Sequence, residues 1–552
     1  MSSRTTNQSD VIVVGAGPIG LVAALLIADA GIRTTVVERA LAPSDLPRAI
    51  SLQDESLRTF EQLGIAEALK AESLLDTGSR YFGLDDRLLA EAKPVPSRIG
   101  QPAKTQFDQP ILEQLLFDRA VEHPGIELLL GTEAVELVHD TEGVVLTVEG
   151  PDASGEQVRR ELRAGWLLGA DGGKSFTRAA LGIDLVGTTQ PQRWIVIDLL
   201  GDETPREKFA DFHCDGERPY VLVPGIKGRL RIEFMLFDHE DADEMTRPER
   251  IHDLVVPKFR RELDPDDVRR AAVYVAHQRV ARHYRRGRAF LIGDAAHLMP
   301  PFAGQGLNAG VRDAHNAAWK IIEAVKGGAT EALLDSYETE RRTHGAKMVE
   351  VSRRIGAVVM ATNPAATRVR DAAVRVVNLV PKARRFLANM RFITPPDYAD
   401  GVAVAPAGGT TPLPGVEPGK ALSQPTVVDA DGVERGLDAH LGAGWSVIGL
   451  GADPGQLDPY WTGIDAELVR LLPPASRPRP AVGDGPGSTQ VAETQPVLTG
   501  SHTGKPVFIA VRPDRYVAAV FAPADEQRVI GELRHFVDDR ARAARRTASE
   551  RA

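Results

Sequence analysis

The sequence contains very little cysteine, since Cys214 is the only one among 552 residues. A single thiol excludes an intramolecular disulfide, a C-x-x-C redox motif and a zinc site built from several cysteines. We therefore expect a fold that forms without disulfides, no metal site, and a reducing compartment such as the cytoplasm.

The sequence also lacks an excess of positive charge. The formal net charge is −10, with 66 Lys and Arg residues against 76 Asp and Glu residues. Proteins that bind nucleic acid neutralise its phosphates with clustered Lys and Arg, and no basic stripe of that kind is present. No nucleic-acid partner is expected.

A long uninterrupted apolar segment is missing as well. Residues 11–28 are apolar and approach the length that crosses a bilayer, but glycines and a proline interrupt them and Asp29 follows. The polar residues 1–10 do not resemble a signal peptide. We expect no membrane contact, and the length of the chain predicts two or three domains.

The first informative feature that is present is a glycine-rich turn between a strand and a helix. Residues 11–14 are typical of a buried parallel strand, residues 19–30 of a helix, and residues 34–37 of a second strand. This unit carries the G-x-G-x-x-G pattern at the position where dinucleotide-binding folds use it.

Each glycine of this turn has its own expected task. Gly15 makes the tight turn, Gly17 lets the backbone approach a pyrophosphate, and Gly20 lets the helix pack closely on the strand. Glu38 ends the next strand, where a carboxylate binds a ribose 2′-hydroxyl. An acid at that position would repel a 2′-phosphate, so this turn is not expected to bind NADP.

Two further glycine-rich segments, each with an aspartate, follow far along the chain. One ends in Asp171-Gly172-Gly173; the other spans residues 293–308, beginning with Gly293-Asp294 and opening a helix through a G-Q-G sequence. Asp294 is expected to accept a hydrogen bond from a ribityl hydroxyl, and the amides at the helix start to stabilise a reduced flavin. In this order, the three segments predict one FAD site.

Between the second and third segments the pattern becomes strand-rich, over about residues 190–282. Residues 229–235 alternate charged and apolar side chains, which predicts a half-exposed strand. A sheet with one open face suits a substrate domain laid over a cofactor. Residues 126–130, 135–138 and 144–148 are expected to form antiparallel strands.

These segments together resemble the class A flavoprotein aromatic hydroxylases, the family of para-hydroxybenzoate hydroxylase. The resemblance covers about residues 11–397. The segments PRAISLQDESLRT, QRWIVIDL, ERPYVLVPG, RLRIEFML and MRFITPPDY and the tail RPDRYVAAV are similar to bacterial 3-(3-hydroxyphenyl)propionate hydroxylases.

The resemblance implies an α/β fold with three domains. They are a Rossmann-like FAD-binding domain (1–75, 101–185 and, with a helical region, 284–398), an inserted substrate domain with a mixed or antiparallel β-sheet (76–100 and 186–283), and a C-terminal thioredoxin-like domain that lacks C-x-x-C (399–552).

The resemblance also extends the set of cofactor contacts. In the family, an Arg after the second strand and a Gln opening a Q-x-x-L-E helix contact FAD, and these match Arg48 and Gln109. The residues expected to bind FAD are Gly15, Gly17, Pro18, Gly20, Glu38, Arg39, Arg48, Gln109, Asp171, Gly293, Asp294, Pro300, Gly304, Gln305, Gly306, Leu307 and Asn308.

The family's activity implies an FAD-dependent monooxygenase that ortho-hydroxylates a phenolic acid resembling 3-hydroxyphenylpropanoate. NAD(P)H, a transient co-substrate, reduces the FAD, and O2 reacts through a flavin C4a-hydroperoxide. A second dinucleotide fold is not apparent, which agrees with transient binding of NAD(P)H. A homodimer is a further expectation.

A group that deprotonates the phenol is needed, because phenols have a pKa of about 10. Asp54 is the candidate base; its alternative role is to cap the helix that follows. His213, Tyr220 and Arg231 are candidates for the ring pocket, although strand residues of these types also occur on surfaces and in cores.

Two other functions stay open. The enzyme alternative is a hydroxylase of aromatic polyketides or other bulky phenols. The alternative of another class is a flavin-binding sensor or interaction protein on the same fold, because a fold does not fix a function. Such a sensor would bind FAD without oxidising NAD(P)H in response to aromatic compounds.

Overall fold

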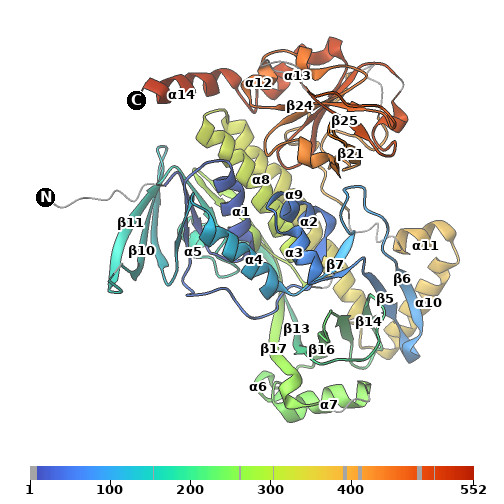
Figure 1. The fold of residues 1–552 in the computed structure, drawn as a ribbon. Coiled ribbons are helices and arrows are strands. Elements are labelled where there is room, and N and C mark those ends of the chain that lie inside the picture. Colours follow the sequence, from blue (N-terminus) through green and yellow to red (C-terminus); the bar gives the residue numbers. More distant parts are fainter. Residues whose placement is uncertain are drawn as a thin grey trace.

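The computed structural model describes residues 9–551 apart from 153, 260–262, 302–303, 389–393, 408–412, 481–487 and 503. These residues form a mixed α/β structure with several sheets (Figure 1). In Figure 1 the C-terminal region, orange and red, lies at the top, while α6 (Ala242–Met245) and α7 (Pro248–Phe259) lie at the bottom. A parallel sheet and its helices lie between them.

The parallel sheet is built around the first glycine turn. In spatial order its strands are β18 (Arg285–Arg286), β19 (Ala289–Leu291), β12 (Trp166–Gly169), β1 (Val11–Val14), β2 (Thr34–Val37) and β8 (Ile126–Leu129). Neighbours run parallel except β18 with β19. β1, β2 and β12 are buried along their whole length, as expected for a parallel sheet covered on both faces.

β8 corrects one expectation. An antiparallel strand is predicted over residues 126–130, but β8 runs parallel to β2. The preceding helix α4 (Gln109–Glu122) packs on β8 and on α1 (Pro18–Asp29), and such a helical crossover returns the chain in the parallel direction. The next three strands do form an antiparallel sheet of their own; they are β9 (Glu133–His139), β10 (Val144–Pro151) and β11 (Gln157–Ala164).

Helices cover the parallel sheet. α1 is buried from Gly20 to Ala28, which explains its uniformly apolar sequence. It packs against α8 (Gly306–Lys326), which in turn contacts α9 (Glu331–Val359) and α2 (Asp54–Gln62). The shorter helices nearby are α3 (Ala66–Ala71) and α5 (Phe176–Ala180).

A large sheet of eight strands lies below the parallel sheet in Figure 1. In spatial order its strands are β20 (His297–Leu298), β17 (Val268–Ala281), β13 (Leu185–Leu199), β16 (Leu230–Leu236), β15 (Tyr220–Pro224), β14 (Phe209–His213), β5 (Gly78–Phe82) and β6 (Leu88–Ala92). Cys214 follows β14 and is buried, which raises the pKa of its thiol to about 12.

Both faces of this sheet are covered, which corrects the expectation of a half-exposed strand over residues 229–235. The apolar side chains of β16, such as Ile232 and Phe234, pack with Ile251 and Val255 of α7. The charged side chains of β16, Arg231 and Glu233, lie on the opposite face and line an internal cavity rather than the molecular surface. A small sheet of β3 (Ser51–Gln53), β7 (Lys104–Gln106) and β4 (Leu74–Leu75) lies nearby.

The C-terminal region contains a seven-stranded mixed sheet. In spatial order its strands are β22 (Glu434–Gly436), β21 (Thr426–Val428), β25 (Thr489–Glu493), β24 (Glu467–Leu472), β23 (Ser446–Leu450), β26 (Val507–Val511) and β27 (Val517–Phe521). Its helices are α12 (Tyr460–Gly463), α13 (Glu526–Leu533) and α14 (Asp539–Arg551), and α10 (Pro364–Asn378) and α11 (Pro381–Ala388) precede it and pack near β6.

Buried charges join this region to the helices of the parallel sheet. We call Lys320, Glu340, Arg512 and Asp514 the junction cluster. Glu340 lies 2.9 Å from Lys320 and 2.7 Å from Arg512, and Arg512 lies 2.6 Å from Asp514. Burial alone would raise the pKa of Glu340, but Arg512 and Lys320 outweigh it and lower this pKa to about 2. Every charge of the cluster therefore has an opposite charge beside it.

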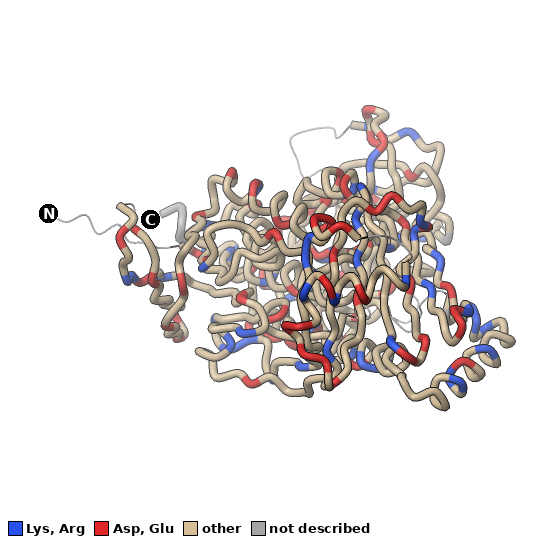
Figure 2. The backbone as a smooth tube through the Cα atoms, turned by 90° about the horizontal axis from the view of Figure 1, so that it is seen from below, with Lys and Arg blue, Asp and Glu red and all other residues tan. Residues whose placement is uncertain are grey.

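Basic and acidic residues are interspersed along the backbone (Figure 2). Within the described ranges, no helix is both long and apolar enough to cross a membrane. The domain boundaries given above stay predictions.

Candidate functional site

A cavity of about 370 Å³ lies between the parallel sheet and the large sheet. One side is formed by residues of the glycine-containing segments and of the two segments matched through the resemblance, which therefore come together as expected for one site. The expected cofactor contacts that line it are Gly17, Pro18, Arg48, Gln109, Asp294, Gly304, Gln305, Gly306 and Leu307.

The first glycine turn leaves space at one position and none at the two others. A Cβ on Gly20 would lie 1.9 Å from the carbonyl oxygen of Gly15, and a Cβ on Gly15 would lie 2.6 Å from that of Ala170. Gly17 has nothing within 4 Å of such a Cβ and lines the cavity. Gly15 and Gly20 therefore allow close packing, while Gly17 offers bare backbone at the start of α1.

Glu38 lies against this turn. One carboxylate oxygen accepts a 2.8 Å hydrogen bond from the amide of Ala16 and the other accepts one of 2.8 Å from the amide of Ala40. The acid is thus held at the end of β2, beside the glycine backbone. The next residue, Arg39, is exposed.

The loop that carries Arg48 is fixed from two sides. The side-chain oxygen of Gln109 accepts a 2.6 Å hydrogen bond from the amide of Ala49. From the large sheet, Arg231 donates to the carbonyls of Pro47 and Arg48, at 2.6 Å each. The Arg48 side chain is exposed toward the cavity that it lines.

Asp171 makes its contacts within its own segment. Its carboxylate accepts hydrogen bonds from the Ser175 hydroxyl and the Thr177 amide at the start of α5. The residues on either side of it, Ala170 and Gly172, line the cavity. The acid therefore shapes the turn, and the neighbouring backbone faces the site.

Asp294 faces the cavity from the third segment. Its side chain is accessible from the cavity although it is set deep in the protein, and this burial raises the pKa of its carboxyl group. The preceding Gly293 donates its amide to Asp313, which also bonds His297 at 2.6 Å and Arg341 at 2.8 Å. His297 and Arg341 are thus supports for the loop.

The start of α8 follows the same segment. Gly304 to Leu307 line the cavity, whereas Pro300 is buried outside its lining. Asn308 is fully buried: its side chain accepts from the Gln53 amide at 2.8 Å and donates to the Gly304 carbonyl at 2.7 Å. Asn308 therefore anchors the helix start to the β3–α2 region rather than facing the cavity.

This arrangement fits an FAD. The bare backbone at Gly17 and the start of α1 suit a pyrophosphate, and the carboxylate of Asp294 suits a sugar hydroxyl. The amides at the start of α8 suit negative charge on a flavin ring.

The large sheet forms the other side of the cavity with alternate residues of four strands. Glu233 stands opposite Val221, Val221 opposite Phe212, and Phe212 opposite Tyr81. All four line the cavity, and the rings of Phe212 and Tyr81 stack with centroids 4.8 Å apart. The floor is therefore apolar and aromatic, with one acid at the β16 end.

The structure does not bring His213 and Tyr220 to this cavity. They stand opposite each other on the other face of the sheet, where their rings stack 4.2 Å apart and Tyr220 packs with Phe234. Strand alternation puts them on the face that α7 covers.

Asp54 also lies outside the lining of the cavity. It begins α2, where its carboxylate accepts hydrogen bonds from the Glu55 amide at 2.9 Å and the Ser97 hydroxyl at 2.6 Å. These are the contacts of an acid at a helix start. Burial raises the pKa of Asp54, and the charge of Glu55 adds to the rise.

Arg231 lines the cavity, but its hydrogen bonds are directed to the protein. Besides the Pro47 and Arg48 carbonyls, it bonds both carboxylate oxygens of Asp198, at 2.6 and 3.0 Å. Arg231 therefore joins the large sheet to the Arg48 loop.

The polar residues of the cavity that the sequence does not single out as site residues include Glu233, Lys104 and Gln106. Burial raises the pKa of Glu233, although Arg231 and the Tyr274 hydroxyl, 2.7 Å away, act against the rise. The alternation in residues 229–235 marked Glu233 as one of a polar set. It could not show that the polar face is turned inward.

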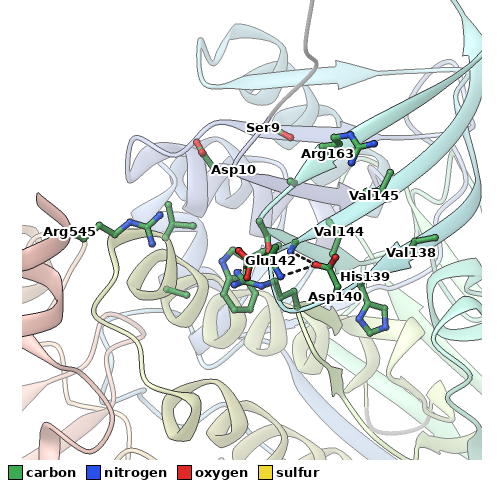
Figure 3. A pocket seen from close by; sticks show the side chains of 17 residues that line it. Ser9, Asp10, Val138, His139, Asp140, Glu142, Val144, Val145, Arg163 and Arg545 are labelled. Carbon is green, nitrogen blue, oxygen red and sulfur yellow. Dashed lines mark hydrogen bonds between the residues drawn. The ribbon is translucent and has the colours of Figure 1, made fainter. Parts of the chain in front are cut away.

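A second hollow of about 540 Å³ lies between β9–β10, the start of β1 and Arg545 (Figure 3). Its acids are used locally: Asp140 accepts from the amides of Glu142 and Gly143, and Asp10 pairs with Arg33. It contains none of the residues expected to bind a cofactor or substrate.

Comparisons with known proteins agree with this geometry. Residues 8–352 match the family described as FAD binding domain, and residues 419–536 match the HcaD C-terminal domain. A 3-(3-hydroxy-phenyl)propionate/3-hydroxycinnamic acid hydroxylase of Burkholderia vietnamiensis is 35% identical, covering 94% of this chain and 95% of that protein. A hydroxylase of the same description from Mycolicibacterium smegmatis is 35% identical over 92% of this chain and 90% of its own.

Solved structures of hydroxylases share the fold. The OxyS anhydrotetracycline hydroxylase of Streptomyces rimosus is 27% identical, with a TM-score of 0.71 over 94% of this chain and 96% of that chain. Aklavinone-11 hydroxylase, solved with FAD and aklavinone, is 23% identical, with a TM-score of 0.72 over 97% and 99%. The chain belongs to the FAD-dependent aromatic hydroxylases, a family of flavoprotein monooxygenases, and FAD is its cofactor.

Proposed function

We propose that the protein hydroxylates a phenolic acid of the 3-hydroxyphenylpropanoate type at the ring carbon ortho to the hydroxyl group. The single observation that carries the proposal is the cavity, which runs from the FAD-binding segments onto an apolar, aromatic floor with one acid, Glu233, at its end. The curated relatives that are 35% identical over nearly the whole chain are named for that substrate class.

The cofactor contacts follow from the residues that face the cavity and from Glu38, which is held against the glycine turn. Gly17 and the start of α1 would hold the pyrophosphate, Glu38 a ribose, and Asp294 the ribityl chain, with Arg48 and residues 304–307 beside the flavin ring. Bound FAD would supply the redox chemistry, namely acceptance of a hydride from NAD(P)H and activation of O2 for transfer of one oxygen atom to the ring.

Glu233 is the group that accepts the proton of the phenol in this proposal. Removing that proton makes the ring more electron-rich at the ortho carbon, where the electrophilic oxygen is added. A carboxylate whose pKa is raised is a stronger base than an exposed one, and the Tyr274 hydroxyl orients it. Asp54, the candidate from sequence, lies outside the cavity lining, so Glu233 replaces it.

The C-terminal region is proposed to be thioredoxin-like in fold and structural in role. β23, α12 and β24 form a parallel strand–helix–strand unit, and β26, β27 and α13 form a hairpin followed by a helix. This order supports a thioredoxin-like arrangement. The only cysteine of the chain lies elsewhere, at Cys214, so no dithiol chemistry is proposed.

The test is turnover by the FAD-loaded protein with a panel of phenols. We expect 3-hydroxyphenylpropanoate to stimulate NAD(P)H oxidation and to yield a catechol in near-equal amount, as identified by mass spectrometry. Response only to multi-ring phenols would overturn the proposed substrate class and favour a polyketide hydroxylase. Bound FAD with no aromatic-stimulated NAD(P)H oxidation would favour a sensor.

A further inference from the structure

β7 presents two polar side chains to the cavity. Lys104 and Gln106 are two residues apart on this strand, so both point to the same side, and both line the cavity. The ammonium group of Lys104 donates a 2.8 Å hydrogen bond to the hydroxyl of Ser79 on β5. Among the described residues, no carboxylate forms an ion pair with it.

This setting differs from that of a structural lysine. Lys320, which is fully buried, lies 2.9 Å from Glu340, whereas Lys104 is half-buried where it lines the cavity. Lys104 has a neutral hydroxyl where Lys320 has a carboxylate, and burial lowers the pKa of Lys104 to about 8. A buried ammonium without an opposite charge is costly, and a bound anion would remove that cost.

Gln106 gives a second, independent sign of a ligand. Its side chain is 3% exposed, and neither its amide nitrogen nor its amide oxygen has a hydrogen-bond partner among the described residues. Buried amide groups are nearly always paired, so an unpaired one beside a cavity marks a position where a ligand completes the bonding. The amide nitrogen can donate to an anion.

We propose that Lys104, with Ser79 and Gln106 beside it, binds the carboxylate of the phenolic acid. The proposal rests on the proposed function and specifies its substrate class. The charge of Arg231, the other buried cation of the cavity, is already compensated by Asp198. Arg48 also lines the cavity, but it belongs to the FAD-binding side, so Lys104 is the cation left to select an anionic substrate.

The position of this subsite matches the rest of the cavity. Ser79 lies on β5 and Glu233 on β16, and β14 and β15 lie between these strands. Three strand spacings separate their backbones by roughly 14 Å, and the side chains of Glu233 and Lys104 reach inward from the two ends. The acid chain of the substrate lies at the Lys104 end and the phenolic hydroxyl at the Glu233 end, with the ring on Val221 and Phe212.

The test compares two ligands that differ only in charge. The FAD-loaded wild type and Lys104→Met are titrated calorimetrically with 3-phenylpropanoate, which lacks the phenol and is not expected to turn over, and with its neutral amide. The wild type is expected to bind the acid about 10- to 100-fold more tightly than the amide, as for a charged hydrogen bond. Lys104→Met should remove this preference and leave the affinity for the amide unchanged.

Two further variants sharpen the result. Lys104→Arg keeps the charge and is expected to restore part of the preference. Lys208→Met removes an exposed lysine that donates to the Leu75 carbonyl outside the cavity lining, and it should behave as the wild type. The flavin absorbance of each variant reports FAD loading and folding.

The outcomes separate this proposal from the proposed function. Equal binding of acid and amide by the wild type, or a preference that survives in Lys104→Met, overturns the subsite even if phenols are hydroxylated. A preference for the acid that Lys104→Met abolishes supports the subsite even if no phenol is turned over, and in that case it is the proposed function that fails.

Discussion

The molecule buries charge in two regions that differ in how the charges are compensated. In the junction cluster, Lys320, Glu340, Arg512 and Asp514 bond one another within 2.9 Å. In the cavity, Lys104 bonds a hydroxyl and forms no ion pair within the part of the chain that the structure describes, and Asp294 is accessible from the cavity. The junction cluster is buried from all sides, whereas Lys104 is half-buried.

This difference in compensation distinguishes charged residues that stabilise the fold from charged residues that bind a ligand. A buried network in which every member is paired holds two parts of the fold together and leaves nothing for a ligand to bond. A buried charge without its counterpart is stable only because the rest of the fold compensates for its cost, and it is positioned for a ligand. The following predictions test whether substitutions in the two regions have different consequences.

The largest effect is expected from Glu340→Gln. It leaves Arg512 and Lys320 without their shared carboxylate, which costs about 3–5 kcal/mol of unfolding free energy for a broken buried pair. Because the pKa of Glu340 is lowered to about 2, its contribution is complete above pH 4.5 and is lost as the pH falls toward 2. Denaturant unfolding at pH 7 measures the loss.

Glu350→Gln on the same helix is the matched control. The side chain of Glu350 is 41% exposed and pairs with Arg353 and Arg354 at the surface, so its loss should not change the unfolding midpoint. Equal midpoints for both variants would remove the distinction between the two regions.

The next effect is expected from Glu233→Gln, which should lower kcat for hydroxylation about 100-fold through loss of the proton acceptor. The rate of FAD reduction by NAD(P)H should stay unchanged in stopped-flow measurements. Raising the pH toward 10, where the phenol ionises by itself, should restore part of the rate. The control is Glu217→Gln, which changes an exposed acid before β15. If Glu233→Gln has the same kcat as the wild type, Glu233 is not the base.

Asp294→Ala should weaken FAD binding about 10- to 100-fold, the range for a hydrogen bond to a charged group. Fluorescence titration of the cofactor-free protein with FAD gives the affinity. The unfolding free energy of the cofactor-free protein should not fall, because the substitution removes a carboxylate whose pKa is raised in the folded protein. Asp335→Ala, an exposed acid on α9, should retain FAD normally.

A smaller effect is expected from pH. Lys104, with a pKa of about 8, is charged below pH 8 and loses its proton above it. Above pH 8, kcat/KM for the phenolic acid should therefore fall by up to about tenfold per pH unit relative to kcat/KM for a neutral phenol, whose binding does not depend on the charge of Lys104. The other charged side chains of the cavity are Arg48, Arg231, Glu233 and Asp294. Parallel profiles for the two substrates would contradict the role of Lys104.

The smallest effect is expected from Asp54→Asn. Since Asp54 lies outside the cavity lining, kcat should stay within about twofold of the wild type, as for a substitution away from the site. A fall comparable to that of Glu233→Gln would return Asp54 to the list of candidate bases.

The cofactor side of the site was predictable because local sequence determines it. Gly15 and Gly20 are required by contacts with their own turn and its neighbour, and Asp294 comes three residues after the end of a short buried strand. A glycine or an acid at such a position is therefore a direct sign of the cofactor site in the sequence. The direction of β8 was not predictable from its own residues, because it depends on the path of α4.

The substrate side was harder to predict for a physical reason. Both faces of the large sheet are covered, so both carry apolar residues, and alternation in β14 and β15 does not show which face meets the cavity. His213 and Tyr220 were therefore as plausible as Phe212 and Val221. The inward direction of Glu233 and the missing partners of Lys104 and Gln106 depend on strands far apart in sequence.

The burial of Cys214 has a practical consequence. As the sole thiol, buried and with a pKa of about 12, it will not react with maleimides while the protein is folded. Labelling at this one position therefore counts the molecules in which the large sheet has opened. The chain contains a built-in reporter of unfolding that needs no engineered residue and can rank the variants proposed above.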